Sequence, residues 1–322
     1  MSPFSWNLLA DLREMWSVPL LLNAFRAGTV IAIVAAVVGW FMVLRRQSFA
    51  GHTLALVGFP GAAAAVWLGV GVAVGYFTSC IAAALVIALL PAAGRRGYRE
   101  ESALIGTVQA FALACGTLFI SLYKGLLGGP TALLFGTITG ISARQVVTLA
   151  IVGAAVLVAI AVIGRPLIFA SVDPDVAAAN GVRVRWLDAV FLVLLGATAA
   201  EASQITGTLL VFALLLLPAA TAQLITARPG PSLALAVALG LVSIWAALFI
   251  AVYSTYPIGF WLTTIAFGMY VLAAIFAAVR RGQWRRLGSA LGHRRPSKRA
   301  EPQRAAAVSL ERDRAGIEGA AS

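Results

Sequence analysis

Charged residues are scarce in this sequence, and their scarcity limits what the protein can be. Only 11% of the residues are charged, whereas 61% are hydrophobic, and a soluble domain carries about 25% charged residues. Apolar stretches of about 20 residues recur along the chain, and a helix of that length crosses the hydrocarbon core of a bilayer. The composition therefore predicts an all-α, polytopic membrane protein.

Histidine, cysteine and catalytic motifs are equally scarce. The chain has 2 His and 2 Cys, and it contains no G-x-x-x-x-G-K-[ST] phosphate-binding loop, no HExxH and no G-x-S-x-G. Cys80 and Cys115 lie in separate apolar segments without CxxC spacing, which indicates buried, inert thiols. We therefore expect neither an enzymatic activity nor a cofactor in this chain, so that ATP hydrolysis would require a separate subunit.

Positive charge is plentiful, but its distribution argues against nucleic-acid binding. The net charge is +12, and the basic residues gather in short loops and in the segment 280–322. Basic loops on one side are the positive-inside signal of membrane topology, so we expect no nucleic-acid partner. The segment 280–322 is predicted to be a disordered tail. Its Arg and Lys would contact anionic membrane lipids or remain solvated without a specific role.

Nine apolar segments are predicted to cross the membrane, with eight or ten crossings as alternatives. They lie near 27–44, 52–70, 72–91, 103–121, 146–163, 187–206, 208–225, 231–252 and 257–279. These segments form a transmembrane domain over 27–279. It is preceded by an N-terminal segment, 1–26, in which residues 5–25 would form an interfacial helix.

The loop charges predict the orientation of these segments. When the segments alternate, most loop arginines fall on one side, which the positive-inside rule makes cytoplasmic. The C-terminus is then cytoplasmic and the N-terminus lies outside. The multi-pass chain is expected in a bacterial inner membrane.

Helix-disturbing residues lie within several apolar segments. Phe59-Pro60-Gly61 is predicted to interrupt the second segment, and Gly207 separates the sixth from the seventh. Irregular backbone at membrane depth is tolerated where protein buries it or a watery cavity receives it. Transporters build their binding sites from such broken helices. The interruptions therefore favour a transporter over a simple membrane anchor.

A short helix is predicted in the loop after the fifth segment. Asp173 is suited to the N-cap, Pro174 to the first helical position and Gly181 to the left-handed position beyond the end. Such a helix either has only the structural role of connecting two spans or docks into a cytoplasmic motor protein. The residues alone leave both interpretations open.

Several motifs occur together in an order that resembles one family. These are Val172–Val184, Leu187–Leu195, Gly207–Leu210, Leu217–Ala222, the outer-loop sequence Leu133-Leu134-Phe135-Gly136-Thr137-Ile138, and Gly51–Leu56 with Pro60-Gly61. Together they resemble the permease family of ABC transporters for zinc, manganese and iron. The last two resemble the Leu-Phe-Gly motif and the second-span motif of that family.

The resemblance implies an importer of type II architecture. Its partners would be a second copy of the permease, a cytoplasmic ATP-binding subunit and an extracytoplasmic metal-binding protein. It also implies that the short helix is a coupling helix, with Asp173, Pro174, Asp175, Asn180 and Gly181 at the contact with the ATPase. Metal would enter as substrate.

The sequence departs from the family at the second-span motif. The family typically has Asp there and His four residues later, whereas this chain has His52 and Leu56 at those positions. A single imidazole suits zinc better than manganese, so zinc is the favoured cargo and His52 its expected ligand. A metal chelate or another small ligand is the alternative, because open zinc sites usually carry three protein ligands. A non-transporting membrane scaffold is a further alternative, and His52 itself could merely cap a helix.

Glu201 is the second candidate for the substrate pathway. Apart from Asp188 at the edge of the same segment, it is the only acidic residue inside a predicted span. Intramembrane carboxylates usually face a cavity or a partner. Glu201 would attract a cation or gate the pathway, with Gln204 on about the same face, or it would simply bond a neighbouring helix. Met42 and Cys80 are softer ligand candidates.

Overall fold

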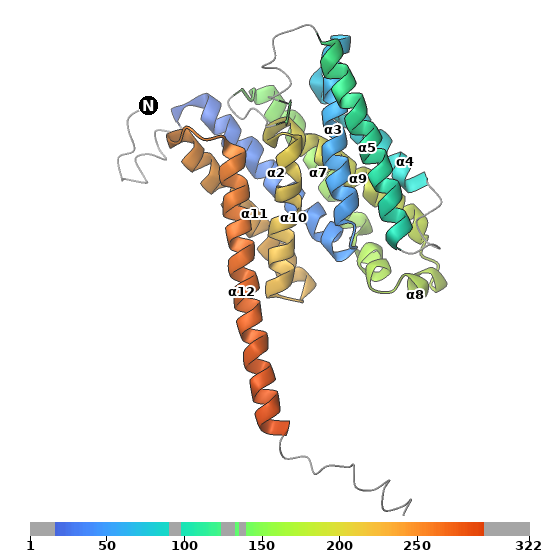
Figure 1. Cartoon of the computed structure of the whole chain (residues 1–322), viewed down its shortest axis with the longest axis vertical. Coiled ribbons are helices and arrows are strands. Elements are labelled where there is room, and N and C mark those ends of the chain that lie inside the picture. Colours follow the sequence, from blue (N-terminus) through green and yellow to red (C-terminus); the bar gives the residue numbers. More distant parts are fainter. Residues whose placement is uncertain (1–16, 90–97, 124–132, 135–139, 293–322) are drawn as a thin grey trace, which may run out of the picture. The chain divides into compact units, whose positions relative to one another are not determined.

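The computed structural model describes residues 17–89, 98–123, 133–134 and 140–292 (Figure 1). The helices are α2 (Pro19–Leu44), α3 (Ser48–Leu68), α4 (Val72–Leu89), α5 (Tyr98–Leu122), α7 (Ala143–Val172), α8 (Pro174–Ala179), α9 (Val184–Thr206), α10 (Thr208–Ile225), α11 (Pro229–Tyr253) and α12 (Ile258–Gly292). Within these ranges 8 helices are long and apolar enough to span a membrane, and Leu210–Ile225 is a shorter apolar helix. The prediction of an all-α protein with eight to nine spans is confirmed.

The first spanning helix begins earlier than the hydropathy indicated. α2 starts at Pro19, so residues 19–26 continue this helix, and the predicted interfacial position of residues 5–25 stays a prediction. Asn23 and Arg26 lower the local hydropathy, but Asn23 Nδ2 donates to the carbonyl of Ile141 at 3.2 Å. A polar side chain with a partner does not end a membrane helix. Residues 1–16 of the predicted N-terminal segment lie outside the described residues.

The predicted break at Pro60 is wrong, whereas the break at Gly207 is confirmed. α3 runs through Pro60 without interruption, because neighbouring helices can compensate the hydrogen bond that proline removes from a membrane helix. Gly207 has φ 76 and ψ 155 and separates α9 from α10. This backbone region is open almost only to glycine.

The last helix reaches into the predicted tail. α12 continues to Gly292, so residues 280–292 are helical rather than disordered, and residues 293–322 lie outside the described ones. The contacts divide the chain into two compact units, Met1–Ala274 and Ile275–Ser322. The predicted boundary at 279/280 stays a prediction.

The core of the first unit is built around α2 and α3. α2 packs against α7, α9, α10 and α11, whereas α3 packs against α4, α5, α9 and α10. Small residues allow the closest approaches: Gly39 of α2 lies against the backbone of Leu215 in α10, and Gly61 of α3 against Gly75 of α4. Such contacts are typical of membrane helices, which cannot rely on the hydrophobic effect to associate.

Candidate functional site

The short helix α8 has the capped geometry that its sequence predicts. The carboxylate of Asp173 accepts a hydrogen bond from Val176 N at 3.0 Å, and Pro174 occupies the first turn. Gly181 follows Asn180 with φ 83, a conformation that side chains disfavour. Ala177 is fully buried while Val176 is 46% exposed. α8 therefore has one anchored side and one apolar side free to contact a partner protein.

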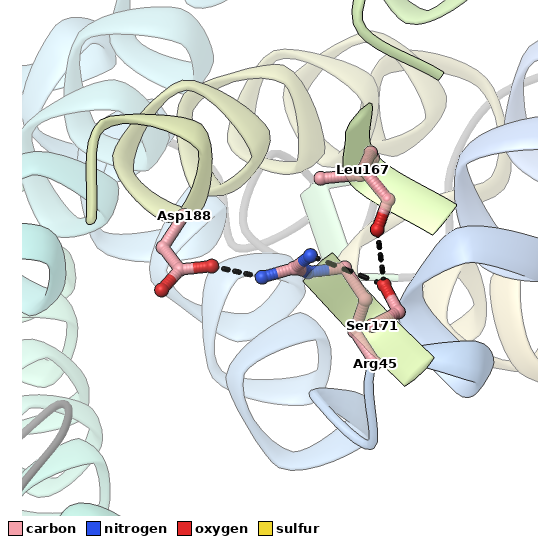
Figure 2. Close-up of polar contacts among 4 residues, drawn as sticks. All are labelled: Arg45, Leu167, Ser171 and Asp188. Atoms are coloured by element: carbon pink, nitrogen blue, oxygen red, sulfur yellow. Dashed lines mark hydrogen bonds and ion pairs between the residues drawn. The ribbon is translucent and has the colours of Figure 1, made fainter. Parts of the chain in front are cut away.

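A polar cluster joins the two helices that flank α8 (Figure 2). Arg45, at the end of α2, forms an ion pair with Asp188 of α9 and donates through Nη1 to Ser171 Oγ of α7 at 3.2 Å. The Ser171 hydroxyl in turn donates to the carbonyl of Leu167. The guanidinium carbon lies 5.5 Å from the ring centre of Phe191. Burial lowers the pKa of Arg45, and the Asp188 carboxylate beside it opposes that shift.

His52 lies in α3 and faces α10. Its ring packs edge-on against Phe212, with the ring centres 4.8 Å apart. Nδ1 is buried and has no hydrogen-bond partner among the described protein groups. A helix-capping or loop-bonding role through this nitrogen is therefore not supported, and Nδ1 is left as a potential ligand atom.

Glu201 is buried in α9 without a partner. It is only 1% exposed, and neither carboxylate oxygen accepts a hydrogen bond from the described residues. A Cβ added at Gly153 of α7 would lie 3.2 Å from Oε1 and close to Val30 and Val34 of α2. The carboxylate therefore points into an apolar crossing of three helices. A group placed there at such a cost indicates a role other than packing.

The structure does not join the remaining candidates into one site. Gln204 Nε2 donates to Ala200 O of its own helix at 3.4 Å. Met42 is fully buried against Gly51, and the thiol of Cys80 is fully buried and donates to Leu54 O at 3.3 Å. Over the described ranges no three His, Cys, Asp or Glu side chains gather as a metal site. His52 and Glu201 also share no hydrogen bond, since neither Glu201 oxygen has one.

Sequence reasoning missed the cluster around Arg45. The sequence places the loop arginines on the cytoplasmic side and Asp188 at the edge of a span. The two residues lie 143 positions apart, so no local pattern links them. The one available signal is an acidic residue at the same membrane edge as the arginines.

Taken together, the spanning helices, the break at Gly207 and the capped loop helix favour the membrane subunit of a transporter. The sequence profile of the ABC 3 transport family matches residues 17–277. The chain belongs to this family of permeases, and the resemblance seen in its motifs is confirmed.

Named relatives and solved structures agree with this assignment. The chain is 29% identical to the manganese transport system membrane protein MntC of Halalkalibacterium halodurans, over 84% of this chain and 92% of that protein. It is 28% identical to the chelated iron transport system membrane protein YfeC of Yersinia pestis, over 76% and 77%. Its fold matches PsaBC from Streptococcus pneumoniae in complex with Fab, with a TM-score of 0.73, 26% identity and coverage of 83% and 95%.

Proposed function

We propose that this chain is the membrane-spanning permease of an ATP-driven importer of a divalent transition metal, with manganese or iron as cargo. The family match over 17–277 carries the proposal. Two copies would form the pathway, a cytoplasmic ATP-binding subunit would drive it, and an extracytoplasmic metal-binding protein would deliver the metal. The chain would lie in the bacterial inner membrane with its C-terminus in the cytoplasm, as the loop arginines support.

The choice of cargo changes from the one that the sequence favoured. Zinc was favoured because one imidazole, His52, occupies the second-span motif. The relatives are named for manganese and iron instead, and the described residues offer no group of three ligands of the kind zinc takes. Manganese and Fe²⁺ accept oxygen ligands more readily than zinc does, so the carboxylate of Glu201 suits either of them.

A chelated metal is the second candidate. The name of YfeC refers to chelated iron, and a chelator brings ligands that the described side chains do not supply. His52 and Gln204 would then contact the chelate rather than the bare ion. Family membership favours either form of transport over a non-transporting scaffold.

Uptake into vesicles containing the complete importer distinguishes these cargoes. With labelled Mn²⁺, Fe²⁺ or Zn²⁺ at equal concentration, we expect ATP-dependent uptake of manganese or iron to exceed that of zinc by about tenfold or more, equivalent to ~1.4 kcal/mol. Equal or faster zinc uptake would overturn the preference. Uptake of an iron chelate without uptake of any free ion would establish the second candidate.

Replacing His52 tests its place in the pathway. His52→Phe keeps an aromatic ring against Phe212 but removes the unpartnered Nδ1, whereas His52→Ala removes both. We expect uptake to fall by about fivefold or more in both variants, because a ligand worth ~1 kcal/mol is lost, at unchanged membrane abundance. If His52→Phe transports like the wild type, the residue acts only through packing.

A further inference from the structure

The segment containing α8 is held at both ends by one side chain. Ser171 lies just before the N-cap Asp173, and Asp188 lies in the first turns of α9, beyond the end of α8. Arg45 bonds to both of them (Figure 2). Because α8 itself is short and packs against α7 and α9 in the described parts of the chain, a push on α8 would reach these two anchor points.

Arg45 lies in the short turn between α2 and α3. Its backbone N–H caps the end of α2 by donating to Phe41 O at 2.9 Å, and the next residue, Arg46, has φ 57. α3 begins directly afterwards at Ser48 and carries His52 in its second turn. A left-handed non-glycine residue is costly, so this turn is held in one conformation. The turn therefore connects Arg45 to the start of α3 through only two residues, Arg46 and Gln47.

The chemistry of Arg45 is better suited to transmitting movement between helices than to stabilising the fold. Its side chain is 7% exposed, and burying an ion pair often stabilises a fold no more than two apolar residues would. Nε is buried without a hydrogen-bond partner in the described parts of the chain. Arginine nevertheless offers a planar fork that can hold two acceptors in fixed directions, which lysine cannot do.

We propose that Arg45 is a positioning residue of the transport cycle, which links movement of α8, through Ser171 and Asp188, to the turn before α3 and so to His52. The proposal rests on the proposed function, because it takes α8 as the contact with the ATP-binding subunit. In this proposal, the ion pair between Arg45 and Asp188, which lie far apart in the sequence, couples ATP hydrolysis to the substrate pathway.

The test removes the charges of Arg45 and Asp188 together. Asp188→Asn alone would leave a buried arginine without its anion, which strongly destabilises a protein. The double variant Arg45→Gln/Asp188→Asn removes both charges and is expected to restore membrane abundance. Arg46→Gln removes the same charge from the neighbouring, exposed position and is the matched control.

The readout is the number of Mn²⁺ ions imported per ATP hydrolysed, in vesicles with the complete importer. We expect this ratio to fall by about fivefold or more in the double variant, the equivalent of ~1 kcal/mol of lost coupling, while Arg46→Gln keeps the wild-type ratio. A structural ion pair would not change the ratio once abundance is restored. A wild-type ratio in the double variant therefore overturns the proposal.

Two further variants cover the remaining outcomes. If the double variant does not accumulate, Ser171→Ala removes one of the two anchors and leaves the ion pair, and an unchanged ratio there overturns the proposal equally. Val176→Asp places a charge on the exposed side of α8 and should stop ATP-driven import. If Val176→Asp still imports Mn²⁺, α8 is not the contact with the ATP-binding subunit and this inference fails. If the wild type imports neither Mn²⁺ nor Fe²⁺, the proposed function fails and this inference with it. If only Val176→Asp uncouples, the inference alone fails.

Discussion

Replacing Gly39 by alanine should abolish accumulation of the folded protein. Gly39 lies where α2 crosses α10, and an added Cβ would collide with the carbonyl oxygen of Leu215 and lie 2.8 Å from its carbonyl carbon. These are backbone atoms of a buried helix, so no side chain can rotate away. Because α2 packs against α7, α9, α10 and α11, its displacement would disturb the whole core. The expected cost is about 3 kcal/mol or more.

Membrane abundance and thermal unfolding in detergent measure this effect, and the chain offers a matched control. Gly268 lies in α12, and a Cβ added there meets nothing within 4 Å. Gly268→Ala should keep full abundance and even gain about 0.5–1 kcal/mol from helix propensity. Wild-type abundance of Gly39→Ala would show that α2 and α10 do not cross as described.

Replacing Glu201 by methionine should raise stability and lower transport at the same time. The carboxylate is buried without a partner, and an unpaired polar group in that setting is costly to the fold. Methionine fills a similar volume without a polar atom. We expect a higher unfolding temperature, from about 1–3 kcal/mol of relieved desolvation, together with a fall of about tenfold or more in metal uptake per molecule, equivalent to ~1.4 kcal/mol.

The opposite signs of the two effects make this test specific. Ser203→Ala is the control on the same helix, because its hydroxyl merely donates back to Ala199 O at 2.7 Å. It should leave both stability and uptake near the wild-type values. If Glu201→Met is more stable and transports normally, Glu201 has no role in the substrate pathway. A loss of stability would mean that the carboxylate has a partner after all.

The features that the sequence predicted well are local ones. The caps of α8 are specified by Asp173, Pro174 and Gly181 within a few positions, and each apolar segment specifies its own helix. The break at Gly207 was visible because the glycine stands between two apolar runs. These predictions need no knowledge of which helix lies beside which.

The features that the sequence could not predict depend on neighbours. Pro60 does not interrupt α3, because its helix is supported by close packing that hydropathy does not record. α2 and α7 extend past polar residues such as Arg26 and Arg165, where the hydropathy falls but the helix continues. The Arg45–Asp188 pair connects distant positions, and the apolar surroundings of Glu201 come from α2 and α7. A single sequence contains no record of these pairings.

The junction at Gly207 restricts where insertions and deletions can occur in this chain. α9 ends at Thr206 and α10 begins at Thr208, so a single residue separates them. Inserting one residue into the first turn of α10 would rotate everything after it by about 100°. Val211, Leu214 and Leu215, all fully buried, would turn away from the core, and Phe212 would leave His52. Insertions and deletions should therefore be excluded here, and tags or fluorescent labels belong in other connections of the chain.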